Sequence, residues 1–129
     1  MARHKSSTLT EVEQELMEII WDRPDGATVA EVHETLAADR RVAFNTVQTT
    51  MRILEDKGYL RHKAEGRAFR YHPIVAREQA SASAVKQLLN RFFGGAPGQL
   101  ALNLLQNERL NKEELAELQR LIDEARPEK

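Results

Sequence analysis

Residues 43–58 read AFNTVQTTMRILEDKG, and this stretch decides how the rest of the chain is interpreted. Apolar and small side chains recur at the period of an α-helix, and Gly58 suits the left-handed residue that often ends one. The spacing therefore predicts a helix over residues 44–57. Its inward face consists of Val47, Thr50, Met51 and Leu54. Its outward face consists of Asn45, Thr46, Gln48, Thr49 and Arg52.

The outward face of this helix is short-chained and polar, and it carries no carboxylate before Glu55. A helix face that serves only solubility more often carries Glu and Lys. Amide side chains can pair with adenine, Arg can pair with guanine, and Thr can contact a thymine methyl group or a phosphate. The face is therefore a candidate for reading DNA, and an ordinary solvent-exposed face is the alternative.

Two further helices are predicted before this one, and each opens with a capping box. In the first box, the Thr10 hydroxyl accepts from the Glu13 amide while the Glu13 carboxylate returns to the Thr10 amide. Thr28 and Glu31 have the same spacing at the start of the second helix. The two predicted helices cover about residues 10–21 and 28–38.

A basic β-hairpin is predicted after the third helix. Alternating runs at residues 59–64 and 68–72 enclose a Gly-containing loop at residues 65–67. Val42 is expected in a further short strand segment, and Phe69 and Tyr71 are expected to pack in the core rather than to stack on bases. Three helices followed by a basic hairpin are typical of a winged helix-turn-helix. The predicted fold class is mostly α with a small β-hairpin.

The charge of the chain is distributed unevenly, although the net charge is only −1. Residues 1–39 carry three basic and nine acidic side chains, whereas residues 40–77 carry nine basic and three acidic ones. A basic block on a helix and a hairpin is the electrostatic footprint expected of a nucleic-acid-binding surface. A solvated charged surface is the alternative interpretation.

Three apolar helical stripes lie in the C-terminal part of the chain. A segment of this size is too small to bury three stripes by itself, and oligomerisation is a common remedy below about 70 residues. We therefore expect a winged-helix domain at residues 1–75 and a helical dimerisation region at residues 76–129; helices folded back on the first domain are the alternative. The expected dimerisation residues are Val85, Leu88, Leu89, Phe92, Leu115, Leu118, Leu121 and Ile122.

The composition argues against an enzyme, a metal site and a membrane protein. The chain has no Cys, which excludes disulfides, thiolate metal sites and Cys nucleophiles. Its four His lack metal-ligand spacing, and it has neither a Gly-rich phosphate loop nor a nucleophile elbow. No apolar run approaches the roughly 18 residues of a membrane span, and the first ten residues show no secretory signal. We expect a cytoplasmic protein without a cofactor.

Several segments together resemble the bacterial penicillinase-repressor family of the BlaI, MecI and CopY type. They are, in family order, residues 9–13, 20–21, 43–49, 52–60, 66–71, 92–95, 100–105 and 111–122. The resemblance implies a homodimeric repressor with N-terminal winged-helix domains and C-terminal dimerising helices, which binds a dyad-symmetric operator in double-stranded DNA. The copper-responsive branch of the family uses a C-terminal Cys cluster, and this chain has no Cys.

The resemblance also implies a mechanism of release. In well-known members, a membrane sensor-protease pathway leads to cleavage of the repressor in its C-terminal region. The scissile bond corresponds to Asn103-Leu104 here, with Leu in place of Phe.

Ten residues are expected to bind DNA, and a winged-helix protein–protein interaction module without sequence-specific DNA binding is the alternative function. Strand alternation implies that the basic residues of the hairpin do not all face DNA. The expected residues are Asn45, Thr46, Gln48, Thr49, Arg52, Arg67, Arg70, Arg40, Arg41 and Lys63.

Overall fold

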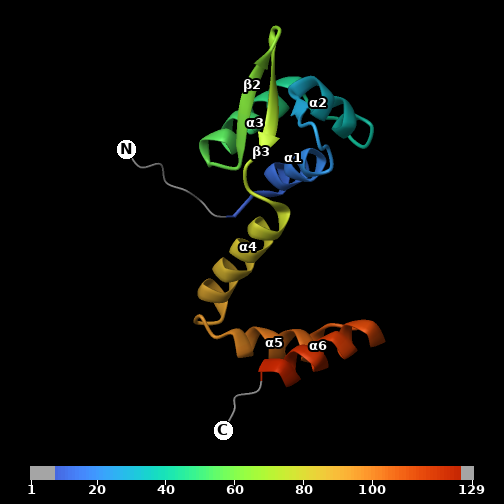
Figure 1. The fold of residues 1–129 in the computed structure, drawn as a ribbon, viewed down its shortest axis with the longest axis vertical. Coiled ribbons are helices and arrows are strands. Elements are labelled where there is room, and N and C mark those ends of the chain that lie inside the picture. Colours follow the sequence, from blue (N-terminus) through green and yellow to red (C-terminus); the bar gives the residue numbers. More distant parts are fainter. Residues whose placement is uncertain (1–7, 126–129) are drawn as a thin grey trace. The chain divides into compact units, whose positions relative to one another are not determined.

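The computed structural model describes residues 8–125, so residues 1–7 and 126–129 of the two expected domains lie outside the described residues. The chain divides into two compact units between Leu88 and Leu89, inside a helix. In chain order, the elements are α1 (Glu11–Trp21), β1 (Ala27–Thr28), α2 (Val29–Ala37), α3 (Phe44–Asp56), β2 (Leu60–Glu65), β3 (Ala68–Pro73), α4 (Arg77–Phe92), α5 (Pro97–Asn107) and α6 (Lys112–Ala125) (Figure 1).

Both predicted capping boxes are confirmed. At α1, the Glu13 amide donates to the Thr10 hydroxyl at 3.2 Å, and the Thr10 amide donates to the Glu13 carboxylate at 2.9 Å. At α2, the Glu31 amide donates to the Thr28 hydroxyl at 3.2 Å, and the Thr28 amide donates to the Glu31 carboxylate at 3.1 Å. Each box satisfies backbone donors that a helix start leaves without an internal partner.

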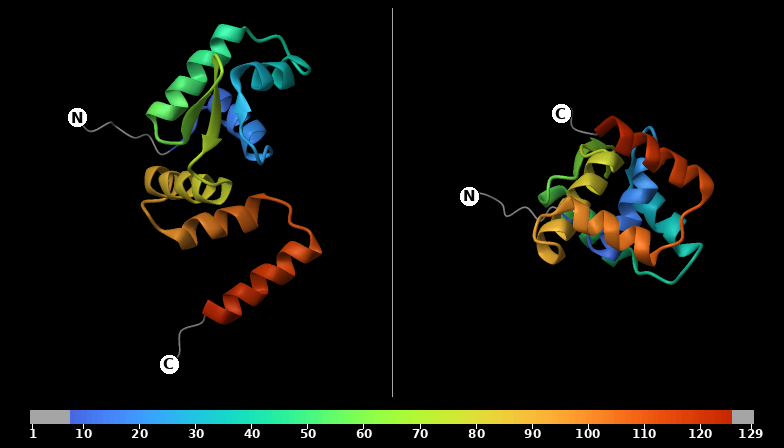
Figure 2. Two further views of the ribbon diagram at one scale, coloured as in Figure 1. Left: turned by 45° about the horizontal axis from the view of Figure 1, so that its top comes forward. Right: turned by 90° about the horizontal axis from the view of Figure 1, so that it is seen from below.

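The core of the first unit lies between α1, α2, α3 and the base of the hairpin. The predicted inward face of α3 is confirmed, because Val47, Thr50, Met51 and Leu54 are all buried. Figure 2 shows α3 lying alongside the hairpin. The largest fully buried side chains are Leu16, Met17, Ile20, Val32, Val47, Met51, Leu54 and Leu60.

A small antiparallel sheet has the strand order β1-β3-β2. The prediction of a strand segment at Val42 is wrong. The two-residue strand β1 takes the edge of β3 instead, with Ala27 opposite Tyr71. The Val42 carbonyl lies 2.9 Å from Nε2 of His33, within the connection between α2 and α3. Val42 therefore has a side-chain partner in place of a ladder partner.

The predicted hairpin is confirmed, with a tighter turn. Glu65 pairs with Ala68, so Gly66 and Arg67 alone form the turn, and the φ of Gly66 is 62°. Burial is confirmed for Tyr71, which is 4% exposed, but wrong for Phe69, which is 48% exposed. Both side chains lie on the same face of β3, but Phe69 lies nearer the turn, beyond the end of the core.

The second unit consists of the end of α4 together with α5 and α6. Asn111 caps the start of α6, because the Glu114 amide donates to Oδ1 of Asn111 at 2.7 Å. No residue of α5 or α6 is buried. Among the described residues, no helix is long and apolar enough to cross a membrane.

Candidate nucleic-acid interface

The outward face of α3 is exposed to solvent along its whole length. Asn45, Thr46, Gln48, Thr49 and Arg52 are all exposed. Thr50 lies on the buried side of the same helix, and its hydroxyl donates to the Thr46 carbonyl at 2.7 Å. The buried hydroxyl thus has a hydrogen-bond partner within the helix itself. The helix therefore separates an apolar inner side from an outer side that presents amides, hydroxyls and one guanidinium.

The hairpin forms the second part of the surface. The wing is defined here as residues 60–73, which are β2, the turn and β3. A hollow of about 320 Å³ lies between α3, the start of α2 and the wing. Gln48 and Arg52 line it from α3, and Arg67 lines it from the turn.

Three aromatic side chains line this hollow, and the sequence pattern did not assign them to the site. Phe44 is 43% exposed and Phe69 is 48% exposed, and both line the hollow together with Tyr71. Burial raises the pKa of the Tyr71 phenol, and the nearby Glu55 carboxylate raises it further. Phe69 is the second residue of β3 and lies close to the turn. This position could have indicated from the sequence that its ring lies outside the core.

His62 stabilises the exposed ring of Phe69. The two rings stack with their centroids 4.0 Å apart. Nδ1 of His62 also lies 2.8 Å from the Glu55 carboxylate at the end of α3. His62 thus connects the wing to α3 beside the hollow.

The cations of residues 40–77 fall into two groups. One group pairs with carboxylates of α1, α2 and the turn after α1: Arg40 with Glu15 at 2.6 Å, Lys57 with Glu13 at 2.7 Å, Arg70 with Glu31 at 3.2 Å, and Arg77 with Glu18 at 2.7 Å and Asp22 at 3.2 Å. The other group forms no ion pair with any residue that the structure describes: Arg41, Arg52, Arg61, Lys63 and Arg67. The uncompensated positive charge is therefore concentrated at α3 and the wing.

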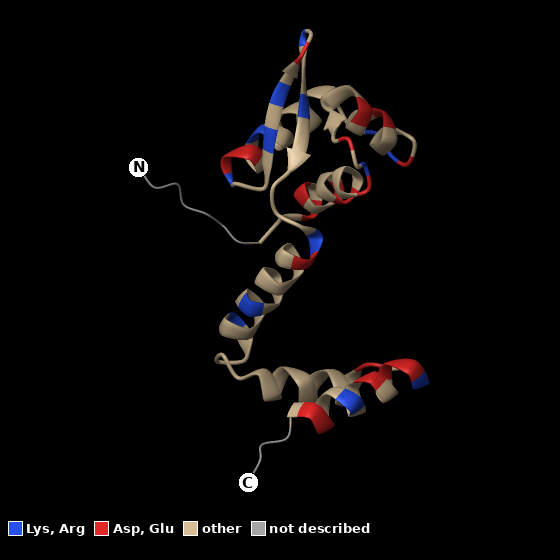
Figure 3. Ribbon diagram, in the orientation of Figure 1, with Lys and Arg blue, Asp and Glu red and all other residues tan. Residues whose placement is uncertain are grey.

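Figure 3 shows the same separation on the ribbon. Lys and Arg lie along both strands and at the tip of the wing, whereas Asp and Glu predominate on α1 and α2. A surface of this kind attracts a polyanion to the wing side of the unit and repels it from the α1 side.

The pairing register divides the basic residues of the wing between two faces. Arg61, Lys63 and Arg70 share one face, because Arg61 lies opposite His72 and Lys63 lies opposite Arg70. Phe69 and Tyr71 lie on the other face. Arg67 lies in the turn, where alternation between faces does not apply.

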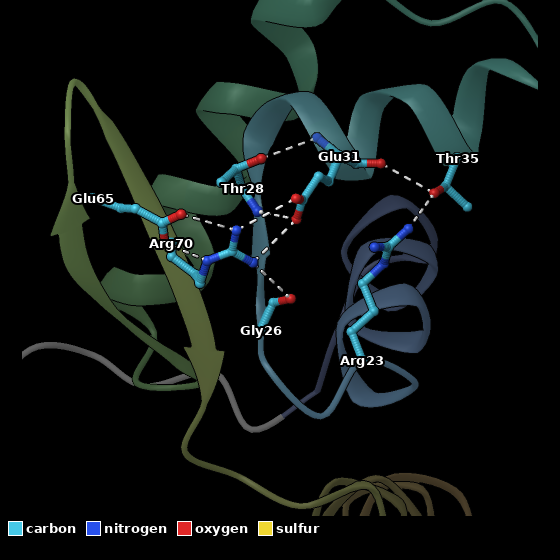
Figure 4. A network of polar contacts seen from close by, with 7 residues as sticks. All are labelled: Arg23, Gly26, Thr28, Glu31, Thr35, Glu65 and Arg70. Atoms are coloured by element: carbon cyan, nitrogen blue, oxygen red, sulfur yellow. Dashed lines mark hydrogen bonds and ion pairs between the residues drawn. The ribbon is translucent and has the colours of Figure 1, made fainter.

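Arg70 is enclosed by carboxylates (Figure 4). Its Nε donates to Glu65 at 2.5 Å and its Nη1 donates to Glu31 at 3.2 Å. Nη1 also donates to the Gly26 carbonyl at 3.3 Å. Glu65 and then Glu31 hold the pKa of Arg70 above its usual value. The guanidinium therefore has three protein partners, on three different elements or turns.

The two carboxylates respond in the opposite direction. The backbone amide of Thr28, and after it Arg70, hold the pKa of Glu31 below its usual range. The hydrogen bonds from Arg70 lower the pKa of Glu65. Both carboxylates are missing from the residues expected from the sequence. The position of Glu65 directly before the turn, in a basic hairpin, could have indicated that it pairs with a cation of the wing. The capping box already explained Glu31, so nothing in the sequence pattern indicated a second partner for it.

The apolar side chains expected to mediate dimerisation are largely exposed in a single copy. On α4, Val85, Leu88 and Phe92 are 49%, 41% and 66% exposed. On α6, exposure ranges from 37% at Leu118 to 53% at Ile122, with Leu115 and Leu121 between them. Leu89 is half-buried. An apolar hollow of about 600 Å³ lies between α5 and α6, lined in part by Leu104, Leu105, Leu118 and Ile122.

The bond expected to be cleaved lies within α5. Asn103 and Leu104 are both exposed, and the Asn103 carbonyl accepts from the Asn107 side-chain amide at 3.0 Å. Among residues 8–125, no group of His, Asp and Glu could hold a metal ion.

Comparisons with known proteins agree with this geometry. A family model described as the penicillinase repressor matches residues 9–124. The chain is 32% identical to the penicillinase repressor of Bacillus licheniformis over 120 residues, which is 93% of each chain. It is also 32% identical to the transcriptional regulator BlaI of Mycobacterium tuberculosis over 98 residues, covering 76% of this chain and 71% of that protein.

The fold is likewise similar to a solved structure. The solution structure of the DNA-binding domain of the repressor BlaI is 30% identical, with a TM-score of 0.52, and the match covers 59% of this chain and 93% of that one. This similarity confirms the winged-helix expectation, and the family relationship favours a DNA-binding repressor over an interaction module. The chain belongs to the penicillinase repressor family, whose members are DNA-binding transcriptional repressors and not enzymes.

Proposed function

We propose that this repressor binds a two-fold symmetric operator as a homodimer and reads base edges with α3. The observation that carries the proposal is the location of the cations without a carboxylate partner. Among the described residues, Arg52 and Arg67 form no ion pair, and they flank one hollow from α3 and from the turn of the wing. DNA phosphates and base edges are the chemistry that such a surface takes.

In this proposal, the outward face of α3 enters the major groove. Asn45 and Gln48 offer amides that can pair bidentately with adenine, and Arg52 offers the fork that fits guanine. Thr46 and Thr49 contact a thymine methyl group or a phosphate. All five side chains are exposed, so none has to leave the core to reach DNA.

The remaining cations contact the sugar-phosphate backbone. Arg67, at the tip of the wing, reaches a phosphate or the minor groove beside the segment that α3 reads. Arg41 and Lys63 supply further phosphate contacts, and Arg40 does so by exchanging its exposed pair with Glu15, which costs little in water. Such contacts fix the register of the protein on the duplex without reading sequence.

Dimerisation follows from the exposed apolar stripes. A second copy that covers the stripes of α4 and α6 removes from water side chains that a single copy leaves 37–66% exposed. We assign residues 1–75 to DNA binding and residues 76–129 to dimerisation. Two linked winged-helix domains then bind two half-sites as one event, which raises their apparent affinity.

Release would follow cleavage between Asn103 and Leu104. A cut there removes α6 with Leu115, Leu118, Leu121 and Ile122, so the dimer loses much of its apolar interface. A membrane sensor-protease pathway would supply the signal, and the repressor would act in the cytoplasm, where its DNA lies.

The test is footprinting of the protein on the DNA upstream of its own gene, followed by a salt titration of binding. We expect paired half-sites about one helical turn, or a multiple, apart, and a steep loss of affinity with salt. Arg52→Ala should reduce discrimination between this site and random duplex by on the order of 1–3 kcal/mol. Lys86→Ala, which removes an exposed cation of α4, is the control. Full-affinity binding of a monomer to one unpaired half-site would overturn the proposal.

A further inference from the structure

The outer half of the wing has no apolar anchor. Every residue from Arg61 to Phe69 is exposed, and the buried side chains of the two strands, Leu60 and Tyr71, lie at its base. An isolated two-stranded hairpin is marginally stable in water at best. The buried core therefore does not set the direction of the tip.

Polar contacts connect the strands to the helices, namely His62 with Glu55 of α3 and Arg70 with Glu31 of α2. Arg70, in the middle of β3, supplies the contact that also reaches the residue beside the turn. Its guanidinium reaches Glu65, the last residue before the turn, through both Nε and Nη2, at 2.5 and 3.2 Å. From the other side it reaches Glu31 in the first turn of α2 at 3.2 Å. Figure 4 shows the guanidinium between the two carboxylates. The outer wing is thereby tied to a helix that belongs to the core.

The geometry suits an arginine and no other cation. The planar guanidinium carries five donors in a fixed fork, and here the fork serves two carboxylates and the Gly26 carbonyl. The side chain is only 22% exposed. A DNA phosphate that displaced these partners would leave two carboxylates beside the DNA, which like-charge repulsion opposes.

We propose that Arg70 is a positioning residue that holds the wing tip, and with it Arg67, in the orientation that meets DNA, without touching DNA itself. The inference rests on the DNA contact proposed above for Arg67. A preformed tip loses less conformational entropy on binding than a mobile one, so the brace contributes to affinity through Arg67.

The experiment is a double-mutant cycle with Arg67→Ala, Arg70→Ala and both changes together in the whole chain. Affinity is measured by fluorescence anisotropy on a labelled mixed-sequence DNA duplex over a range of salt concentrations. Each single change should weaken binding by about three- to tenfold, and Arg67→Ala should lower the salt slope by about one. In the Arg67→Ala background, Arg70→Ala should have no effect beyond that of the control Lys86→Ala. Losses that multiply, with a slope lowered by about two, would show a direct contact by Arg70 and overturn the proposal.

Glu65→Ala provides a second test that leaves Arg70 in place. The change removes a negative charge from the wing, so electrostatics alone predicts tighter DNA binding. The proposal predicts that binding weakens when Arg67 is present and tightens only in the Arg67→Ala background. Equal tightening in both backgrounds would refute the brace.

Hydrogen exchange in the absence of DNA separates this inference from the proposed function. Arg70→Ala and Glu65→Ala should both accelerate amide exchange at residues 65–68, while amides of α1 and α3 keep their protection. If Arg67→Ala leaves DNA binding unchanged, the proposed role of the wing fails whatever the exchange shows. If Arg67→Ala weakens binding but the wing amides are unaffected by Arg70→Ala, the positioning role alone fails.

Discussion

Glu13 connects the start of α1 to the end of α3, and its replacement should be among the more costly single changes outside the apolar core. The residue is 6% exposed. Its Oε1 accepts from the Thr10 amide at 2.9 Å and from Nζ of Lys57 at 2.7 Å. Lys57 is the C-cap residue of α3, the helix that presents the reading face. One carboxylate therefore serves a capping box and an interhelical ion pair.

The expected magnitude follows from these two roles. Loss of one half of a capping box costs about 1 kcal/mol. Breaking a fully buried ion pair costs about 3–5 kcal/mol, whereas an exposed pair contributes about 0.2–1 kcal/mol. The side chain of Lys57 is 19% exposed, so its ammonium group can still reach water and the pair lies between these limits. We expect Glu13→Ala to lower the free energy of unfolding by roughly 2–4 kcal/mol. Glu13→Gln, which keeps an acceptor for Thr10, should cost about half as much.

The assay is urea unfolding followed by far-ultraviolet circular dichroism at one fixed protein concentration, because dimerisation makes stability depend on concentration. The matched control is Glu11→Ala, an exposed carboxylate in the same first turn of α1, which should change stability by less than about 0.5 kcal/mol. A double-mutant cycle with Lys57→Ala should give a coupling free energy of about 1 kcal/mol or more. A Glu13→Ala effect as small as that of Glu11→Ala, or losses that simply add, would refute this reasoning.

Three further predictions concern the wing and the dimer. Gly26→Ala should lower the melting temperature far more than Gly66→Ala. Both glycines have positive φ, but a Cβ at Gly26 would lie 2.5 Å from the Tyr71 carbonyl oxygen, whereas a Cβ at Gly66 would meet nothing within 4 Å. Equal shifts in melting temperature would contradict the structure. The pKa values of Glu31 and Glu65 are held below 4.5, so their contribution to the stability of the wing is complete above that pH and is lost as the pH falls through the lower folded values. Amide protection at the wing tip should therefore stay constant down to about pH 5 and decrease below it. A loss of protection near neutral pH would refute the assignment. Cutting the chain after Asn103 should convert the dimer to monomer in sedimentation and weaken operator binding. The free energy of dimerisation should fall by roughly 25 cal/mol for each Å² of apolar interface that is lost. A cut chain that remains a tight dimer would exclude this route of release.

The parts of the fold that follow local rules could be predicted from the sequence. Both capping boxes rest on residues three positions apart, and the two faces of α3 follow from the helical period alone. The hairpin required only alternation and a Gly-containing loop. Each of these signals lies within one helix or one pair of strands. The helical period, together with the polar and carboxylate-poor composition of the outward face, was enough to mark that face of α3 as a candidate site.

The parts that could not be predicted depend on contacts between distant residues. The strand β1 has two residues and no propensity signal, and it exists because the edge of β3 is available to Ala27 and Thr28. Val42 is β-branched, as strand residues often are, but its carbonyl lies 2.9 Å from Nε2 of His33 and it pairs with none of the three strands. Alternation placed Phe69 on the correct face of β3, but the depth of a side chain depends on where the core ends, and no local pattern contains that information.

The basic residues show this limit most clearly, because a count of charges treats every cation alike. The formal excess in residues 40–77 is not the charge that DNA meets, since Arg70 and Arg77 are matched by carboxylates of the acidic N-terminal segment. By its residue type and its position on the wing, Arg70 cannot be told apart from an arginine that contacts a phosphate. Its role is decided by Glu31 and Glu65, which lie 39 and five positions away in the sequence. A relative with arginine at this position but without the two carboxylates would present a free guanidinium on the wing, so the role of this arginine cannot be transferred between relatives without its partners.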